Sequence, residues 1–279
     1  MYQRVIVTLA LTSLLGSLAA CSSRTAAATQ TTITAFDPSQ SEEKALAAVD
    51  EMVTALGGAE AWTAAKQISW EVKHTVDGKL TEYFKHWWDM WNGRHRFEFL
   101  PPEYLAAPDD KMFTVAMYNL FKRSGGYVYS KAAPTRQVMS AEVKRIVALA
   151  YQVWTRDAYQ LTMFHKLKDP GVKLGYAGER RDYYGSCMDG CIDITVKFDP
   201  AVGKDEYHLL LSKTSKLPEA VEKAIPGGAM GLKVLGWTDV NGLKFPSAVK
   251  NLGAEEVFNF ENIVIAEPSD EFYVVPIAR

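Results

Sequence analysis

Residues 68–99 alternate between apolar and polar side chains in three successive runs, which is the pattern of half-buried β-strands. Turn signals separate the runs: Asp-Gly-Lys at 77–79 and Asn-Gly at 92–93. We therefore predict three adjacent antiparallel strands. Because a slip of one residue would turn every side chain to the other face, the two turns decide which side chains lie together.

The register of these strands follows from the lengths of the two loops. A three-residue first loop pairs His74 with Glu82, and a two-residue second turn pairs Met90 with His95. In this register the three strands share one face, which we call the aromatic wall. Its ten side chains are Trp70, Val72, His74, Glu82, Phe84, His86, Trp88, His95, Phe97 and Phe99.

The aromatic wall mixes large apolar rings with three histidines and a glutamate. Polar groups that are buried without partners destabilise a sealed core, so such a mixture is typical of a partly open, mostly apolar ligand cavity. A second interpretation stays equally open. In it, His74 and Glu82 pair across the strands, while His86 and His95 lie near the margin of the sheet.

Catalytic signatures do not accompany these histidines. The chain has no nucleophile motif, no glycine-rich phosphate loop and no HExxH pair. His74 with Glu82 would suit a general base and its orienting carboxylate, but a binding protein is favoured over a hydrolase. We therefore expect no enzyme activity, no cofactor and no bound metal. A formal net charge of −2 without a basic run argues against nucleic acid as a partner.

Two segments have the spacing of amphipathic helices. The first follows Ser41 and stops at the glycines 57–58, and the second runs from Ser140 to about Arg156. The apolar stripe of the first helix consists of Leu46, Val49, Met52 and Val53. We expect this stripe to face the aromatic wall, as a lid or as permanent core. Short strands and turn signals make up most of the rest, which predicts an antiparallel α+β domain.

The first twenty residues have the character of an export signal, with Arg4 before a short apolar run and small residues after it. At its end, Leu-Ala-Ala-Cys at 18–21 resembles the lipobox of bacterial lipoproteins. The resemblance implies acylation of the Cys21 thiol, palmitate included, and Ser22 favours the outer membrane. We divide the chain into a lipoprotein signal peptide (1–20), a lipidated flexible tether (21–40) and a folded domain (41–279).

Cys187 and Cys191 are the two remaining cysteines. Asp-Gly at 189–190 lies between them and signals a hairpin turn, which would place the two thiols opposite each other. An exported protein meets an oxidising compartment, so a disulfide is favoured. A single C-x₃-C without a second Cys/His pair nearby is a weak zinc signal.

Three stretches resemble LolA/LolB-like proteins, the periplasmic lipoprotein-carrier superfamily, and in particular a poorly characterised branch of it. They are AVDEMVTALGGAEAWTAAKQISWEV at 48–72, RDAYQLTMFHKLKDPGVKLGYAGE at 156–179, and VNGLKFPSAVKN at 240–251 with the terminal FYVVP. The resemblance covers roughly residues 42–277. It implies a strongly curved antiparallel sheet, an incomplete β-barrel, with helices plugging its open side.

In this superfamily the apolar hollow holds acyl chains of lipoproteins or other lipids, and related domains sense envelope components. The resemblance therefore implies an outer-membrane lipoprotein whose periplasmic domain binds an acyl chain, with a role in lipid or lipoprotein trafficking. Its partners would be that lipid or lipoprotein, the membrane through Cys21, and an envelope protein. The alternative is a filled, non-catalytic interaction module that presents Trp87 and Trp91 to such an envelope partner.

Overall fold

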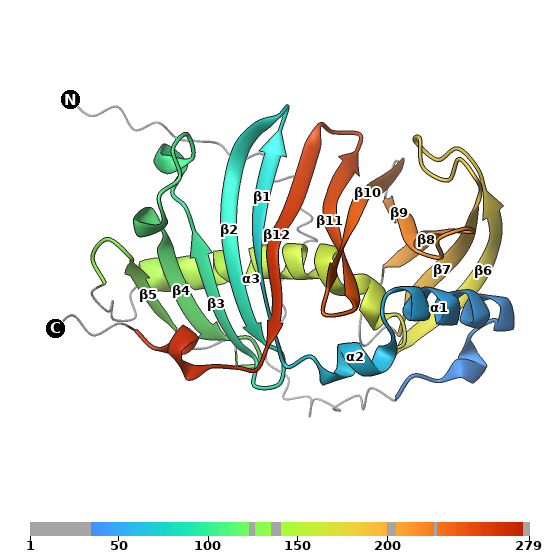
Figure 1. Ribbon diagram of the computed structural model, residues 1–279, viewed down its shortest axis with the longest axis horizontal. Coiled ribbons are helices and arrows are strands. Elements are labelled where there is room, and N and C mark those ends of the chain that lie inside the picture. The colour runs from blue at the N-terminus through green and yellow to red at the C-terminus, as the bar shows by residue number, and fades with distance from the viewer. Residues whose placement is uncertain (1–34, 123–125, 135–140, 200–204, 226–227, 276–279) are drawn as a thin grey trace, which may run out of the picture. The chain divides into compact units, whose positions relative to one another are not determined.

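The computed structural model describes residues 35–122, 126–134, 141–199, 205–225 and 228–275. The predicted signal peptide, the lipidation site Cys21 and most of the tether lie outside these residues, as does Ser140. The described chain forms one antiparallel sheet of twelve strands, with three α-helices and several 3₁₀ turns (Figure 1).

The strands fall into two groups that are separated in the chain by the longest helix. The first group comprises α1 (Glu43–Ala55), α2 (Ala59–Ala64), β1 (Gln67–Val76), β2 (Lys79–Asp89), β3 (Arg94–Phe99), β4 (Thr114–Asn119) and β5 (Tyr127–Ser130). Helix α3 (Ala141–Thr162) and the 3₁₀ segment η4 (Met163–Lys166) lead to the second group. It comprises β6 (Val172–Arg180), β7 (Cys191–Phe198), β8 (Glu206–Ser212), β9 (Pro218–Ile225), β10 (Gly228–Val240), β11 (Leu243–Leu252), β12 (Glu256–Ala266) and the 3₁₀ turn η5 (Asp270–Tyr273).

Each group of strands is a meander, and the two meanders meet in the middle of the sheet. The order across the sheet is β5-β4-β3-β2-β1-β12-β11-β10-β9-β8-β7-β6, so β1 pairs with β12. Strands β5 and β6 follow each other in the chain but lie at opposite edges of the sheet. Helix α3 makes most of the crossing between them (Figure 1). The predicted α+β fold with an open, curved antiparallel sheet is confirmed.

Two hydrophobic clusters fill the inner face of the sheet, which is the face that the helices cover. In the first cluster, Val153 and Leu161 of α3 are buried with wall residues that include Trp70 and Phe97. The second cluster joins α1 and η4 to strands β6–β9. The first cluster also includes Leu243 and Phe245 of β11 and Phe258 of β12, so α3 covers the first meander together with the middle of the sheet, whereas α1 completes the core over β6–β9.

The turn between β1 and β2 differs from the predicted three-residue loop. Val76 pairs directly with Lys79, which leaves a two-residue turn whose members both have positive φ. A bulge between His74 and Thr75 then shifts the register. The extra residue is Thr81, whose hydroxyl donates a hydrogen bond to the carbonyl of His74 (3.1 Å). The loop length is wrong and the cross-strand pairing of His74 with Glu82 is confirmed, because the bulge compensates for the shorter turn.

The turn between β2 and β3 is longer than predicted, because Asp89 pairs with Arg94 and leaves four residues between them. The Asp89 carboxylate organises this turn. It accepts hydrogen bonds from the backbone and side chain of Asn92 (2.9 and 2.8 Å) and from Arg94 Nε (2.8 Å). The predicted pairing of Met90 with His95 is therefore wrong, and Trp88 faces His95 instead. The shift is by two residues, so the wall side chains keep their common face.

Replacing Asp89 by asparagine should lower the free energy of unfolding by about 2 kcal/mol, because the amide cannot accept all of these bonds and loses the charge that pairs with Arg94. Burial opposes the charged form, but the bonds from Asn92 and Arg94 outweigh it and hold the pKa of Asp89 below its usual 3.8. The contribution should therefore persist above pH 3.8 and fade as the pH falls through the lower value of the folded protein.

The measurement is urea unfolding of both variants of a matched pair, Asp89→Asn and Asp77→Asn. Asp77 lies in the neighbouring hairpin turn with a φ of +49°, a conformation that asparagine tolerates well. Its substitution should change the free energy by less than about 0.5 kcal/mol. Equal effects at the two positions would contradict the role assigned to Asp89.

Candidate functional site

An apolar pocket opens between the end of α3 and the outer strands of the second meander. Its volume is about 400 Å³, which is typical of small-molecule sites. The lining residues come from α3, η4, the following turn and strands β6–β8: Tyr159, Met163, Lys166, Leu167, Asp169, Pro170, Val172, Val196, Phe198 and Tyr207. Lys166 and Asp169 are its charged members, so the pocket suits an apolar ligand.

The pocket lies where α3 tightens into a 3₁₀ turn before it reaches the edge of the sheet. The hydroxyl of Thr162 donates to the carbonyl of Ala158 (2.6 Å), and the chain continues as η4. The turn at 169–171 then leads into β6 and is closed by a hydrogen bond from the N–H of Val172 to the carbonyl of Asp169 (3.2 Å). Helix, turn and strand thus surround the pocket on different sides.

Aromatic rings border the pocket on the side of the strands. The Tyr207 ring lies 5.6 Å from that of Tyr159 and 6.0 Å from that of Phe198. Burial raises the pKa of both tyrosines, so their hydroxyls stay neutral. Lys166 is half-buried and Asp169 is exposed, which places the charges toward solvent. The pocket thus combines an apolar interior with a polar edge, as an amphiphilic ligand would require.

The aromatic wall lies elsewhere, beneath α3. Its most buried members, at 1% exposure or less, are Trp70, Val72, His86, His95 and Phe97. The expected helix end at Arg156 is too early: α3 continues to Thr162 and packs over the wall. The prediction that the wall lines a partly open cavity is therefore wrong for the described structure. Phe99 borders a second, more polar hollow of about 540 Å³ between β3–β5 and α3.

We expected the apolar stripe of helix α1 to face the aromatic wall, and this prediction is wrong. Val49 and Met52 are fully buried in the second cluster, and Leu46 and Val53 pack partly buried against it. Backbone bonds fix this position, because the N–H of Glu42 donates to the carbonyl of Leu174 at the β6 edge (2.9 Å). None of the four stripe residues lines the apolar pocket. The stripe is core of the second meander, and a lid over the wall is excluded by its location.

A continuous polar chain runs through the interface between the wall and α3. Its members in order of contact are Tyr118, His95, His86, Asp157, Arg156, Glu82 and His74. Tyr118 Oη lies 2.9 Å from His95 Nδ1, and His95 Nε2 lies 3.2 Å from His86 Nδ1. His86 Nε2 lies 3.1 Å from Asp157 Oδ2. Both histidines and the aspartate are fully buried, so the predicted position of His86 and His95 at the sheet margin is wrong.

Arg156 joins this inner part of the polar chain to an outer part. Its Nε donates to Asp157 (2.7 Å), and its Nη1 donates to Glu82 (3.0 Å). Glu82 also contacts His74 Nδ1 at 3.1 Å, so the predicted side-chain pair of His74 and Glu82 is confirmed. The polar side chains of the wall are thus partners of each other and of an ion pair on α3.

Burial and pairing together set the charges in the polar chain. Burial opposes ionisation of Asp157, but Arg156 and His86 outweigh it and hold its pKa below the usual 3.8. The pKa of Glu82 is lowered in the same way by His74 and Arg156, against burial. Burial lowers the pKa of His86 in spite of Asp157, and the pKa of His95 lies well below 6.5. At neutral pH the carboxylates are ionised and the two inner histidines are neutral.

Sequence reasoning missed Asp157 and Tyr118. Asp157 occupies the apolar stripe of α3, four residues after Val153 and four before Leu161, and all three are buried. A charged residue in such a stripe predicts a buried partner on the facing sheet, so a signal was present. Tyr118 lies on β4, which pairs with β3 after a long connection that carries no hairpin signal.

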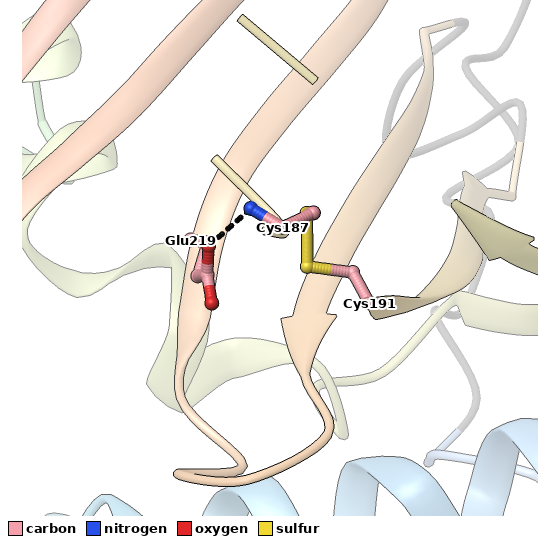
Figure 2. A group of neighbouring side chains, drawn as sticks. All are labelled: Cys187, Cys191 and Glu219. Atoms are coloured by element: carbon pink, nitrogen blue, oxygen red, sulfur yellow. Dashed lines mark hydrogen bonds between the residues drawn. A yellow bond between two sulfur atoms is a disulfide. The ribbon is translucent and has the colours of Figure 1, made fainter. Parts of the chain in front are cut away.

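Cys187 and Cys191 form the predicted disulfide, and both are fully buried (Figure 2). The backbone N–H of Cys187 donates to the Glu219 carboxylate. These three residues lie close enough together to hold a metal ion, but metal binding needs thiolates and here the sulfurs are bonded to each other.

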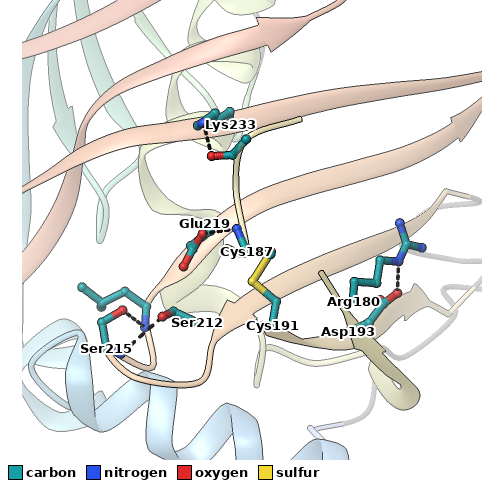
Figure 3. The surroundings of a disulfide bond; sticks show 10 residues. Arg180, Cys187, Cys191, Asp193, Ser212, Ser215, Glu219 and Lys233 are labelled. Atoms are coloured by element: carbon teal, nitrogen blue, oxygen red, sulfur yellow. Dashed lines mark hydrogen bonds and ion pairs between the residues drawn. A yellow bond between two sulfur atoms is a disulfide. The ribbon is translucent and has the colours of Figure 1, made fainter. Parts of the chain in front are cut away.

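The disulfide fastens the loop at 181–190 to the outer face of the second meander (Figure 3). Lys233 Nζ donates to the carbonyl of Gly185 (2.8 Å) and holds the same loop from β10. Beside it, Arg180 pairs with the buried Asp193 (2.5 Å). The loop is thereby a fixed part of the domain. Among the described residues, no helix combines the length and apolar character of a membrane span.

Comparison with protein-family models gives no match, and neither does comparison with curated proteins. Solved structures similar to the chain include a DUF1329 family protein from Desulfovibrio piger, at 12% identity and a TM-score of 0.44, covering 84% of this chain and 98% of that one. A LolA superfamily protein from Nitrosomonas europaea has 8% identity and a TM-score of 0.44, covering 82% and 97%. An outer membrane lipoprotein-sorting protein domain from Vibrio parahaemolyticus has 11% identity and a TM-score of 0.42, covering 82% and 96%. The neighbours include the superfamily that the sequence resembles, and similarity at this level assigns no ligand.

Replacing both Cys187 and Cys191 by serine should lower the free energy of unfolding by about 2 kcal/mol, because the five-residue loop that they close restricts the unfolded chain only modestly. Urea unfolding of the wild-type protein in a reductant should show the same loss. The reductant should leave the double variant unchanged. Equal stability of wild-type and variant under oxidising conditions would contradict the structural role of this bond.

Proposed function

We propose that this protein binds a hydrophobic ligand, the acyl chain of a lipid or of a lipoprotein, in the apolar pocket beside α3. The observation that carries the proposal is the lining, because every residue around the pocket except Lys166 and Asp169 is apolar or aromatic. Water in such a pocket has few hydrogen-bond partners. Its replacement by an alkyl chain is favourable by about 25 cal/mol per Å² of apolar surface buried.

Lys166 suits the polar end of such a ligand. Its side chain lines the pocket and is half-buried. A cation beside an apolar pocket favours an amphiphile that carries a carboxylate or a phosphate at the end of its chain. The proposed ligand is therefore an anionic amphiphile, with its chain inside and its head at Lys166.

The amino-terminal sequence supports the location that we propose for this binding domain. The lipobox-like residues 18–21 would leave Cys21 acylated at the outer membrane, and the tether at 21–40 would hold the domain in the periplasm. Two or three acyl chains make a lasting anchor. An anchored domain that binds acyl chains suits the receipt or transfer of lipids or lipoproteins, which is the role implied by the sequence resemblance.

Trp91 supports a second candidate function, that of an interaction module for an envelope protein. Its side chain is 63% exposed in the β2–β3 turn, and Phe121, just after β4, is 68% exposed. Exposed aromatic side chains of this kind mark partner sites. The Trp87 ring is half-buried and stacks on Phe272 of η5 at 6.1 Å, so Trp91 is the more exposed of the two predicted aromatic residues.

A hydrolase that uses His74 and Glu82 has no support in the geometry. The His74 ring stacks on Phe258 at 4.2 Å and is only 9% exposed. Glu82 is occupied by Arg156 at 3.0 Å. A general base must reach the proton of a bound substrate, and the packing of His74 leaves no approach for one.

Replacing Phe198 by aspartate should weaken the binding of a fluorescent fatty acid by the purified full-length protein at least about tenfold. The new carboxylate would lie beside the alkyl chain, and a charge that loses water without a partner costs more than the roughly 1.4 kcal/mol that tenfold represents. Phe198 is half-buried at the end of β7, so the fold should survive. Circular dichroism and the melting temperature check this.

Phe121→Asp is the matched control, since it makes the same change at an exposed position that does not line the pocket. It should bind the fatty acid as tightly as the wild-type protein. Native mass spectrometry after lipid extraction would identify the natural ligand. A wild-type protein that carries no lipid and takes up no fatty acid would overturn the proposal in favour of a protein partner at Trp91.

A further inference from the structure

The inner part of the polar chain has a single direction of hydrogen bonding. Asp157 is ionised and can only accept, so Nε2 of His86 carries a hydrogen and donates to it. Nδ1 of the neutral His86 is then an acceptor, and Nε2 of His95 must donate to it. Nδ1 of His95 in turn accepts from the hydroxyl of Tyr118. The geometry thus assigns the Nε2–H tautomer to both histidines.

Every ring nitrogen of the two histidines is occupied in this arrangement, so the polar chain has no place for an added proton. A proton on His86 Nδ1 would set two N–H donors against each other across the 3.2 Å contact. Relief requires that His95 moves its hydrogen to Nδ1 and donates to Tyr118. The Tyr118 hydroxyl would then lose the acceptor that it has in the neutral chain.

The neighbouring charges offset this cost only in part, because the Asp157 carboxylate favours protonation of His86 but burial outweighs it. Arg156 and Asp157 face the pair from α3, as does Tyr151 near Tyr118, and the positive charge of Arg156 opposes protonation of His86. From the sheet, the other titratable groups of the polar chain are Tyr118 on β4 and the paired His74 and Glu82 on β1 and β2. The carboxylates are already paired with Arg156.

We propose that the polar chain is an acid-sensitive latch that fastens α3 to the sheet, and that uptake of a proton by His86 and His95 releases the helix. Asp157 is two residues before Tyr159, which lines the apolar pocket, so release of α3 opens one wall of that pocket. The latch itself depends only on the polar chain. Its effect on a ligand rests on the proposed function.

The direction of the pH effect follows from burial. Imidazoles exposed by opening titrate near their usual 6.5, whereas burial lowers the pKa of both histidines in the closed form. The latch should therefore hold fully above pH 6.5 and weaken as the pH falls below it, until the closed form binds the proton as well. Asp157 and Glu82 have pKa values below 3.8 and 4.5, so their titration lies in a separate, more acidic window.

The first test uses the full-length wild-type protein. Amide hydrogen exchange in peptides from 143–158, corrected for the intrinsic effect of pH, should rise by up to about tenfold per pH unit below 6.5 for each proton taken up on opening. Peptides from α1, which is buried in the second cluster and not in the cluster of the polar chain, should respond less. Nitrogen-15 NMR of the histidine rings should find Nε2–H tautomers at His86 and His95 at pH 7.5.

The second test replaces the two histidines by glutamine, which keeps a donor and an acceptor but does not titrate. The variant His86→Gln/His95→Gln should lose the pH response of the α3 peptides, whatever its protection at neutral pH. The control is His165→Gln, at another buried histidine, whose pKa burial lowers to about 4 and which contacts the carbonyl of Lys244 outside the polar chain. It should keep the response.

The latch would be overturned if amide exchange in the α3 peptides did not change between pH 7.5 and 5, or if it changed equally in the glutamine variant. So would Nδ1–H tautomers at neutral pH. If α3 responds as expected and the fluorescent fatty acid is released in the same pH range, both proposals are supported. If α3 responds and the protein binds no fatty acid at any pH, the latch stands and the proposed function fails. Should the Gln variant not fold, the tautomers and wild-type exchange decide the matter.

Discussion

Helix α3 carries an ion pair, Arg156 and Asp157, into the interface that it forms with the sheet. This ion pair decides which polar side chains the strands beneath the helix must contain. A buried charge without partners would cost several kcal/mol, so the facing strands must supply hydrogen-bonding groups. They supply His86 for Asp157 and Glu82 for Arg156. The polar residues of the aromatic wall are therefore explained by the helix that covers them and not by an open cavity.

Much of the local structure was predictable, because short-range patterns determine it. Strand alternation placed the wall side chains on one face. The lengths of both loops were predicted wrongly, but the face stayed the same. A bulge compensates for the shorter β1–β2 turn, and the longer β2–β3 turn shifts the pairing by two residues. The disulfide followed from five consecutive residues and the expected compartment. What could not be predicted was long-range. No pattern near α1 or α3 in the sequence indicates which strands each helix covers, so the wall was assigned to the wrong helix.

The apolar pocket escaped prediction for a related reason. Its lining comes from η4, from the turn before β6 and from three strands that are sequential in the chain but join α3 only in the fold. Each contributes one to three side chains, and no single stretch carries a recognisable pattern. Lys166 and Asp169 looked like ordinary loop residues.

The pairing of β1 with β12 has a consequence for the order in which this chain can fold. Strand β1 ends at Val76, and its neighbour on one side begins only at Glu256. Helix α1 is also made early, yet its core partners lie on β6–β9. Such distant contacts make folding slow, because loop entropy is lost before the contacts form. The centre of the sheet therefore cannot form until β12 is present, and until then the exposed edge of β1 leaves the incomplete chain open to aggregation.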